Sequence, residues 1–195
     1  MPDYDVLLLG CGIGQGQPTI DLVRALLLSP GLKLPPVVLD ADGLNILSRQ
    51  PDWSKEFPGE AIFTPHAGEM ARLLGCSIEE IQSNRLEAAQ EAAAKWHKTV
   101  VLKGAYTVIS APDGRVRVSP FANAGLASAG TGDVLAGAVA GMLAQGLSLF
   151  EAAACGVYLH GLAGELVRAE MGDAGMLASD LLPVLPRAIR QLKEV

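Results

Sequence analysis

The sequence predicts an α/β protein with a mainly parallel central sheet that helices cover on both faces. Short aliphatic runs alternate along the chain with longer segments of helical periodicity, as in β–α units. Residues 37–39 are apolar at consecutive positions, which is typical of a strand covered on both faces. The 195 residues are 50% hydrophobic and 18% charged, a composition that excludes disorder and is sufficient for one packed domain over residues 1–195.

The amino-terminal half is expected to consist of strand–helix units. Residues 6–9 form the first strand, and a glycine-rich loop at 10–16 follows it. A helix then spans 19–28, with Pro18 near its start and Pro30-Gly31 after its end. Further strands are expected at aliphatic runs, and further helices where apolar residues recur at helical spacing. The further strands are 37–40 and 61–64, and the further helices are 68–74 and 83–97.

The carboxyl-terminal half adds a strand, a hairpin and three helices. Residues 99–102 are the fourth strand. Runs rich in β-formers at 106–110 and 116–119 flank Pro112-Asp113-Gly114, a turn signal, and therefore predict a hairpin. Ser179 is expected to be the N-cap of the last helix. The three helices of this carboxyl-terminal region are 131–144, 149–170 and 179–192.

Charge and cysteine content exclude several functional classes. The net charge is −6 and no run of Lys or Arg is present, so we expect no nucleic-acid-binding face. Cys11, Cys76 and Cys155 are too few and too far apart for a disulfide framework or a zinc site. The amino terminus does not resemble a signal peptide. The longest uncharged stretch, 134–150, is shorter than the roughly 20 apolar residues of a membrane span. We therefore expect a cytoplasmic protein that binds no membrane.

Ligands of open α/β sheets bind beyond the carboxyl ends of the strands, so the loops at those positions are the first places to search. The loop at 10–16 matches neither the dinucleotide fingerprint nor the phosphate loop. It is either a close backbone approach to a ligand or a plain strand-to-helix turn. Asp40-Ala-Asp-Gly-Leu-Asn45 follows the second strand. Its carboxylates and amide predict a sugar hydroxyl or water-bound Mg²⁺ nearby, and helix capping is the alternative.

The next two strands are followed by a histidine motif and a lysine motif. In Thr64-Pro-His-Ala-Gly-Glu69, His66 is a candidate ligand, with a surface or satisfied core histidine as the alternative. Glu69 also suits a helical first turn without any ligand. In Lys103-Gly-Ala-Tyr-Thr107, the lysine is a compact charge suited to phosphate. The alternative is a lysine that snorkels at the sheet edge.

The strongest motif is Asn123-Ala-Gly-Leu-Ala-Ser-Ala-Gly-Thr-Gly-Asp133, which leads into an apolar helix. Small residues let backbone amides point at one spot, and a helix amino terminus adds partial positive charge, so this segment predicts a phosphate-binding anion hole. Asp133 in the first turn fits a general base beside a phosphoryl-transfer site, with an ordinary amino-terminal carboxylate as the alternative.

The last four motifs, in this order, resemble the ADP/ATP-dependent NAD(P)H-hydrate dehydratases of the ribokinase-like superfamily. The resemblance covers the chain from about residue 4 to the last helix. Gly-Thr-Gly-Asp alone indicates the superfamily, whereas the Asp-Ala-Asp and Thr-Pro-His motifs indicate the dehydratases. It implies a ribokinase-like fold and repair of hydrated NADH or NADPH at the expense of ADP or ATP. Mg²⁺ is the implied cofactor, and a homo-oligomer is the implied assembly.

The resemblance also implies roles for individual residues. Asp133 would be the base that activates the ring hydroxyl. The nucleotide, including its transferring phosphoryl group, would contact Lys103, Gly104, Ala105, Tyr106, Thr107, Asn123, Gly130, Thr131 and Gly132. The hydrated dinucleotide would contact Gly12, Gly14, His66, Asp133, Asp40 and Asn45, the last two together with Asp42 also organising Mg²⁺ and water. No residue is assigned as a direct metal ligand.

The sequence departs from the family pattern in its loops and at its front. Cys11, Ala67 and Ala124 stand where proline is usual, which loosens loops without removing a reactive group. A segment that normally precedes the strand at 6–9 has no counterpart, so we expect an amino-terminally incomplete domain with an unpaired sheet edge at that strand or its neighbour. Two alternatives stay open: a ribokinase-like kinase for a small alcohol, and a non-catalytic nucleotide-binding subunit.

Overall fold

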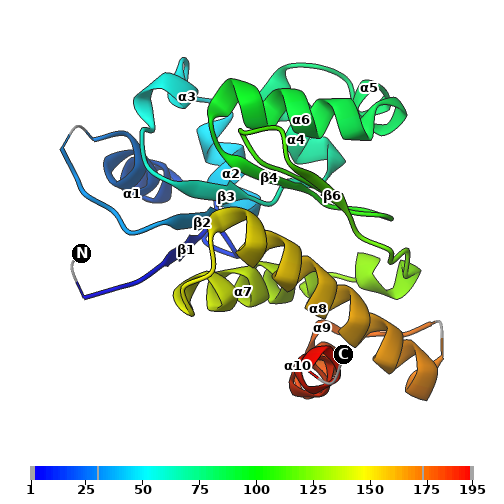
Figure 1. The fold of residues 1–195 in the computed structure, drawn as a ribbon. Coiled ribbons are helices and arrows are strands. Elements are labelled where there is room, and N and C mark those ends of the chain that lie inside the picture. Colours follow the sequence, from blue (N-terminus) through cyan, green and yellow to red (C-terminus); the bar gives the residue numbers. More distant parts are fainter. Residues whose placement is uncertain (1–2, 30, 173, 194–195) are drawn as a thin grey trace.

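Four aliphatic runs of the chain pair side by side as parallel strands. The computed structural model describes residues 3–29, 31–172 and 174–193, and its centre is a six-stranded sheet of order β1-β2-β3-β4-β5-β6 (Figure 1). Strands β1 to β4 are parallel, and β5 and β6 continue the sheet as an antiparallel hairpin. The strands are β1 Leu7–Leu9, β2 Val37–Leu39, β3 Ala61–Phe63, β4 Thr99–Leu102, β5 Val108–Ser110 and β6 Val116–Val118.

The three central parallel strands are buried along their whole length, which explains their unbroken apolar sequences. Every residue of β2, β3 and β4 is buried. Because successive side chains of a strand point to opposite faces, Val37 and Leu39 enter one core and Val38 enters another. The expected coverage of both faces is therefore confirmed. Strand β1 lies at one edge of the described sheet and is only partly buried.

Six helices and an aromatic cluster cover one face of the sheet (Figure 1). The rings of Trp53 and Phe63 lie 5.6 Å apart between centroids, and Trp53 lies 5.2 Å from Trp96. These contacts fill the space between β3 and the helices above it. The six helices are α1 Gln17–Leu28, α2 Ala41–Leu47, α3 Trp53–Glu56, α4 Ala67–Leu74, α5 Ile78–Ser83 and α6 Arg85–Trp96.

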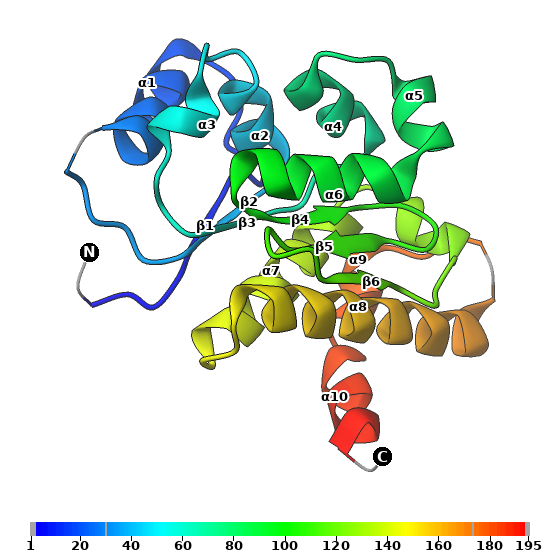
Figure 2. The ribbon, with the colours of Figure 1, turned by 45° about the horizontal axis from the view of Figure 1, so that its top comes forward.

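Two long helices cover the opposite face, and two short ones lie beyond them. Helix α7, Thr131–Ala144, and helix α8, Leu149–Met171, pack against each other and against the sheet. Helices α9, Ala178–Leu181, and α10, Leu185–Lys193, pack on α8 in a separate cluster, and Figure 2 shows α10 extending away from the sheet. A short 3₁₀ segment, η1 at Ala124–Ala127, precedes α7. Within the described ranges, no helix is both long enough and apolar enough for a bilayer.

The expected helix at 179–192 is wrong as a single element. It divides into α9 and α10, separated by a turn that contains Pro183. Proline has no N–H to donate and clashes with the preceding turn of a helix, so it ends the first piece. Ser179 lies inside α9, whose N-cap is Leu177, with Asp180 accepting from the Leu177 N–H at 2.8 Å.

Smaller differences occur in the amino-terminal half. Helices α2, α3 and α5 were not among the expected elements, and the helix expected to begin at Ser83 begins at Arg85 instead. Asn84 separates it from α5 and has non-helical backbone angles. Helix α1 ends at Leu28 as expected, and Pro30 lies outside the described residues.

Candidate active site

The loops that follow β1, β2, β3 and β4 meet at the carboxyl edge of the sheet, and the start of α7 joins them. Lys103, directly after β4, contacts both Asp40, after β2, and Glu69, on α4. Cys11, in the loop after β1, lies beside Asp40 and Asp133. The prediction that the motifs gather at this edge is therefore confirmed by their contacts.

A buried ion-pair network lies at the centre of this edge. The Lys103 Nζ lies 2.5 Å from Asp40 Oδ1 and 3.8 Å from Glu69 Oε2. The side chains of Asp40 and Glu69 are 1% and 5% exposed, and that of Lys103 is 17% exposed. A snorkelling lysine is therefore the wrong interpretation, because the ammonium group points inward to two carboxylates. A methyl group added at Gly132 would lie 3.5 Å from this Nζ, which places the charge beside the start of α7.

Asp42 holds the glycine-rich loop in place. Its Oδ2 accepts from the Gly14 N–H at 2.9 Å, and its Oδ1 accepts from the Gln15 amide at 2.7 Å. Neither Asp40 nor Asp42 makes a side-chain cap on α2, so capping does not explain this motif. Gly10 allows the close approach of the two loops, since a methyl group there would lie 1.8 Å from the Asp40 carbonyl oxygen. Asp42 is thus a structural partner of the loop, and its expected role in organising Mg²⁺ and water stays a prediction.

Gly12, Gly14 and Asn45 surround the same loop. Gly12 and Gly14 have φ of 64° and 73°, a left-handed backbone that favours glycine, and open space lies beside both. Asn45 lies on α2, one turn after Asp42, and its Oδ1 is buried without a hydrogen-bond partner among the described residues. Contact of these three residues with a dinucleotide stays a prediction.

His66 is the N-cap of α4. Its Nδ1 accepts from the Gly68 N–H at 3.0 Å and the Glu69 N–H at 3.3 Å. Glu69 returns the contact, because its Oε2 accepts from the His66 N–H at 2.8 Å. The two residues form a reciprocal capping box. Local helix structure alone therefore accounts for a histidine and a glutamate at these positions. The His66 side chain is half exposed, and its Nε2 lies 3.4 Å from Glu69 Oε1, so the expected contact with a dinucleotide stays a prediction.

The start of α7 has the backbone arrangement expected of an anion hole. Gly130 is the N-cap with φ of 84° and makes no side-chain cap. The Gly130 carbonyl accepts from the N–H groups of Asp133 and Val134, and the Ser128 carbonyl accepts from the Thr131 N–H. Among the described residues, the Gly132 N–H has no backbone acceptor. One amide at the positive end of α7 is therefore available to an anion.

Cys11 places a neutral thiol between the two carboxylates of the site. Its Sγ lies 4.0 Å from Asp40 Oδ2, and the ligand atoms of Cys11, Asp40 and Asp133 all lie within 4.8 Å of one another. Burial, and then the negative charges of Asp40 and Asp133, raise the pKa of Cys11 to about 12. The thiol therefore stays protonated at neutral pH, and the two carboxylates are the groups here that suit a hard divalent cation.

A cavity of about 360 Å³ opens beside this edge. Of the predicted nucleotide-binding residues, it brings together Lys103, Gly104, Ala105, Thr107, Asn123, Thr131 and Gly132. Thr107 closes its loop, because its Oγ1 donates to the Gly104 carbonyl at 2.9 Å. Asn123 caps η1 by accepting from the Gly125 N–H at 2.9 Å, and its buried Nδ2 has no partner among the described residues.

Two predicted nucleotide-binding residues do not line this cavity. Tyr106 has φ of 54° and a 56% exposed side chain, and only its backbone N–H points inward, to the Phe121 carbonyl at 2.9 Å. Gly130 lies behind the cavity lining, where a methyl group would be 3.1 Å from the Ala178 side chain. The pattern Lys-Gly-x-x-Thr therefore lines the cavity without its tyrosine.

Sequence reasoning missed several residues of the lining. Phe121, Leu126, His160 and Gly161 line the cavity, and the last two come from α8. A methyl group at Gly161 would lie 2.2 Å from the Phe121 ring, so glycine permits this close packing. The available signal was His160 itself, since it is a titratable residue at a buried position of an otherwise apolar helix segment.

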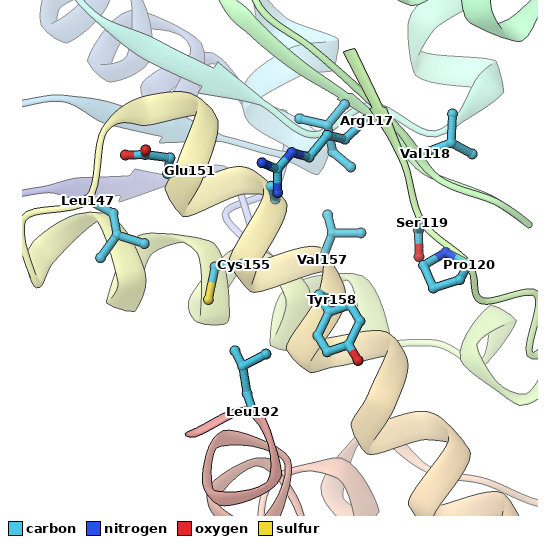
Figure 3. A pocket seen from close by; sticks show the side chains of 12 residues that line it. Arg117, Val118, Ser119, Pro120, Leu147, Glu151, Cys155, Val157, Tyr158 and Leu192 are labelled. Atoms are coloured by element: carbon cyan, nitrogen blue, oxygen red, sulfur yellow. The ribbon is translucent and has the colours of Figure 1, made fainter. Parts of the chain in front are cut away.

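A second cavity lies next to the first but shares little of its chemistry. It has a volume of about 500 Å³ and lies between β6 and α8, with Leu192 of α10 at its border (Figure 3). The two cavities share Ser119 and Val157 in their linings. The ring pair Phe121–Tyr158, at 5.3 Å between centroids, lies between them. The predicted site residues do not line this second cavity.

The chain is similar to known proteins over nearly its whole length. A family model described as NAD(P)H-hydrate dehydratase matches residues 2–187. The chain is 46% identical over 194 residues to the bifunctional NAD(P)H-hydrate repair enzyme Nnr of Moorella thermoacetica, covering 100% of this chain and 36% of that protein. It is 41% identical over 184 residues to the ADP-dependent (S)-NAD(P)H-hydrate dehydratase of Neisseria meningitidis serogroup B, covering 93% of this chain and 62% of the relative. The chain thus spans between a third and two thirds of these curated relatives.

Solved structures of related proteins also match this chain over most of its length. The ADP/ATP-dependent NAD(P)H-hydrate dehydratase of Bacillus subtilis, co-crystallised with ATP/Mg²⁺, matches with a TM-score of 0.83 and 36% identity, over 96% of this chain and 65% of that chain. A ribokinase-like superfamily protein of Enterococcus faecalis V583 matches with a TM-score of 0.78 and 30% identity, over 96% of this chain and 63% of that one. The expected α/β, ribokinase-like fold is therefore confirmed.

Proposed function

Because this chain belongs to the NAD(P)H-hydrate dehydratase family, we propose that it converts hydrated NADH and NADPH back to NADH and NADPH, with ADP giving AMP and phosphate. The observation that carries the proposal is one arrangement at the carboxyl edge of the sheet. Asp133, the Lys103–Asp40 ion pair and the free Gly132 amide converge there beside a cavity large enough for part of a nucleotide.

The reaction joins a kinase step to an elimination. Hydroxide is a poor leaving group from the hydrated nicotinamide ring. Phosphoryl transfer from ADP to the ring hydroxyl forms a new C–O–P linkage and releases AMP, and the hydroxyl proton passes to the base. The ring nitrogen's lone pair then expels phosphate as the C–O bond breaks, and loss of a proton from the adjacent ring carbon restores the double bond.

Asp133 is proposed as the base of the first step. It lies in the first turn of α7 with an exposed side chain, so a substrate hydroxyl can approach it from solvent. The Gly132 amide beside it is proposed to donate to the transferring phosphoryl group, where a fixed donor stabilises developing charge. In this arrangement the ring hydroxyl, the transferring phosphoryl group and the Asp133 carboxylate would lie next to one another. Such proximity of the reacting groups speeds a reaction.

Lys103 is proposed to supply positive charge to the phosphates. Its ammonium group lies beside the Gly132 backbone and is held there by Asp40 and, at longer range, Glu69. Two carboxylates fix the lysine by ion pairing, so it is already oriented when the nucleotide binds. Its neighbours Gly104, Ala105 and Thr107 line the nucleotide cavity, together with Asn123.

The carboxylates present fit Mg²⁺, which the Bacillus subtilis relative was crystallised with alongside ATP. Mg²⁺ prefers oxygen ligands and usually binds one or two carboxylates together with substrate phosphates. Asp40 and Asp133 offer such oxygens within 4.8 Å of each other, whereas the Cys11 thiol between them is a soft and protonated group. When bound, the cation would neutralise phosphate charge during transfer.

The hydrated dinucleotide is proposed to lie against the glycine-rich loop. Gly12 and Gly14 leave open space there, and Asp42 keeps the loop in position. The half-exposed side chain of His66, which follows β3, would contact the same ligand. A homo-oligomer and a cytoplasmic location stay predictions, the latter supported by three free cysteines among the described residues.

The test is regeneration of reduced cofactor. The protein is incubated with hydrated NADH or NADPH, Mg²⁺ and either ADP or ATP, and absorbance at the reduced nicotinamide band is followed. We expect regeneration together with stoichiometric phosphate. A longer relative serves as the positive control, because this chain covers only part of its relatives.

The open alternatives give different results in the same assay. A small-alcohol kinase would give a stable phosphorylated product without phosphate release, and His66→Ala would leave it intact. A non-catalytic subunit would bind ADP, raising its melting temperature, without turnover. Absence of regeneration with both nucleotides, while the control is active, overturns the proposed function.

A further inference from the structure

His160 is a buried polar side chain that touches the start of α7. It lies on α8, is 7% exposed, and lines the nucleotide cavity. Its Nε2 lies 2.9 Å from the carbonyl oxygen of Thr131, the first residue of α7. A carbonyl oxygen only accepts, so Nε2 carries the proton and donates, and Nδ1 has none. The contact joins residues 29 positions apart and ties α8 to the phosphate-binding end of α7.

The carbonyl that His160 holds belongs to the same peptide unit as the free amide. The C=O of Thr131 and the N–H of Gly132 lie in one plane and point in opposite directions, because the peptide bond is planar and trans. Fixing the direction of the carbonyl therefore fixes the direction of the N–H. This N–H is the first-turn amide that has no backbone acceptor among the described residues.

The side chain of Thr131, the residue that carries this carbonyl, is also held. The Thr131 hydroxyl is 2.6 Å from the Leu126 carbonyl and 2.8 Å from the Ser128 carbonyl. The N-cap Gly130 makes no side-chain cap, so these contacts and His160 add to the backbone hydrogen bonds that orient the helix start. Glycine at 132 has little rotational restriction of its own, which makes an external constraint effective.

The imidazole of His160 is suited to a role in which its protonation state does not change. Burial is the main cause that lowers the pKa of His160, the Thr131 hydrogen bond opposes it, and the nearby Lys103 charge lowers the pKa as well, so the net pKa is about 4. The ring is therefore neutral at physiological pH. A neutral donor orients the carbonyl without adding a second positive charge next to Lys103.

We propose that His160 is a positioning residue that aims the Gly132 N–H at the transferring phosphoryl group by holding the carbonyl of the same peptide unit. The inference rests on the proposed function, since phosphoryl transfer is the step that uses this amide. The interaction would matter most in the transition state, where charge on the transferring oxygens develops.

Three variants separate positioning from packing. His160→Leu removes the donor and keeps an apolar side chain in the space. His160→Gln keeps an N–H donor at a similar reach. Val167→Ala, at a buried position on the same helix that does not line the nucleotide cavity, is the matched control for destabilisation alone. All three are compared with the unmodified full chain for melting temperature, ADP affinity by calorimetry, and kcat and KM.

We expect His160→Leu to lower kcat about tenfold to a hundredfold, as small misplacements at active sites do, with the ADP dissociation constant changed much less. His160→Gln should recover most of kcat. Val167→Ala should lower the melting temperature and leave kcat unchanged when assayed well below it. If His160→Leu keeps full kcat, or if His160→Gln loses as much kcat as His160→Leu at equal stability, the inference is wrong.

A readout that needs no turnover separates this inference from the proposed function. The Gly132 amide resonance of the ¹⁵N-labelled, ADP-bound protein should shift and exchange faster with solvent in His160→Leu, but not in Val167→Ala. If the unmodified chain shows no dehydratase turnover, the proposed function fails. If the Gly132 resonance and its exchange are identical with and without His160, the positioning role fails, whatever the turnover.

Discussion

The candidate site consists of two regions built by different means. The ion-pair region, Asp40, Lys103 and Glu69, is made of charged side chains that follow β2, β4 and β3 and meet in a buried position. The helix-start region, residues 130–133 with His160, is made of backbone groups whose direction depends on packing and on one buried imidazole. The two regions touch at Gly132, where Lys103 approaches the backbone.

The difference between the regions shows where each is vulnerable. In the ion-pair region, removing one charged side chain leaves another charge buried without a partner. The stability of the protein therefore depends on which side chains are present there. In the helix-start region, the groups proposed to contact the phosphoryl group are backbone groups, which mutation cannot remove. Function there depends on the direction in which these backbone groups point. Changes in the first region should therefore act on folding and, at Lys103, also on phosphate binding, whereas changes in the second should act mainly on the rate of the reaction.

The largest effect is expected at Asp133. This residue belongs to the helix-start region, and its carboxylate also lies within 4.8 Å of Asp40 in the ion-pair region. Asp133→Asn should lower turnover of hydrated NADH about 10²-fold to 10⁴-fold, because the base is lost, with almost no change in melting temperature. Asp113→Asn, an exposed carboxylate on the β5–β6 turn, is the control and should keep full turnover. Equal turnover of both variants would remove Asp133 from the chemistry.

The next effect tests the ion-pair region directly. Lys103→Met should lower the free energy of unfolding by about 3–5 kcal/mol, because it leaves the buried Asp40 carboxylate unpaired. The double change Asp40→Asn with Lys103→Met should regain much of that loss. Lys55→Met, which breaks the exposed pair with Asp52, should leave the free energy of unfolding almost unchanged. Urea unfolding measures all three, and a similar small cost at both lysines would contradict the buried network.

A pH dependence is expected from the helix-start region. The pKa of His160 falls from 6.5 to about 4 on folding, chiefly through burial. The unfolded chain therefore binds a proton below pH 6.5 that the folded chain does not, so this stability is complete above pH 6.5. It is lost as the pH falls to about 4, by about 3 kcal/mol.

The measurement is urea unfolding at pH 7 and pH 4.5, with His160→Gln as the comparison. The variant has no titrating group at this position, so its stability should fall less over the same interval. If both proteins lose stability equally, the ring is not held neutral by its surroundings, and the two regions differ less than their structures indicate.

The smallest effect is expected at the border of the ion-pair region. Asp42→Ala removes the acceptor of the Gly14 N–H and of the Gln15 side chain, so it should destabilise the protein by about 1 kcal/mol. It should also raise KM for the hydrated dinucleotide more than it lowers kcat, since the loop becomes less ordered. Asp21→Ala, on the exposed side of α1, is the matched control. A KM equal to that of the control would separate the loop from the substrate.

Much of the fold could be predicted because it depends on local pattern. Strand β4 and helix α7 have the expected bounds, since a continuous aliphatic run and a glycine-rich helix start are both readable over a few residues. The division of the last helix is also readable from the sequence, because Pro183 stands inside the expected range 179–192.

The site could be predicted only as a set of residues at one edge. Motifs after parallel strands must meet, because all carboxyl ends of such strands lie on the same side of the sheet. Their partners do not follow from that rule. Asp40 and Asp42 are two positions apart, yet one pairs with Lys103 and the other with the glycine-rich loop.

The sequence by itself determined the α/β class, the covered strands, the edge of the sheet where the candidate site lies and the residue types gathered there. Each of these depends on periodicity or on short motifs. Only the tertiary structure decided that Lys103 points inward, that the Tyr106 side chain lies outside the cavity lining, and that His160 contacts the Thr131 carbonyl. These outcomes depend on contacts between residues tens of positions apart. Their geometry is set by how whole helices and strands pack, which no local pattern contains.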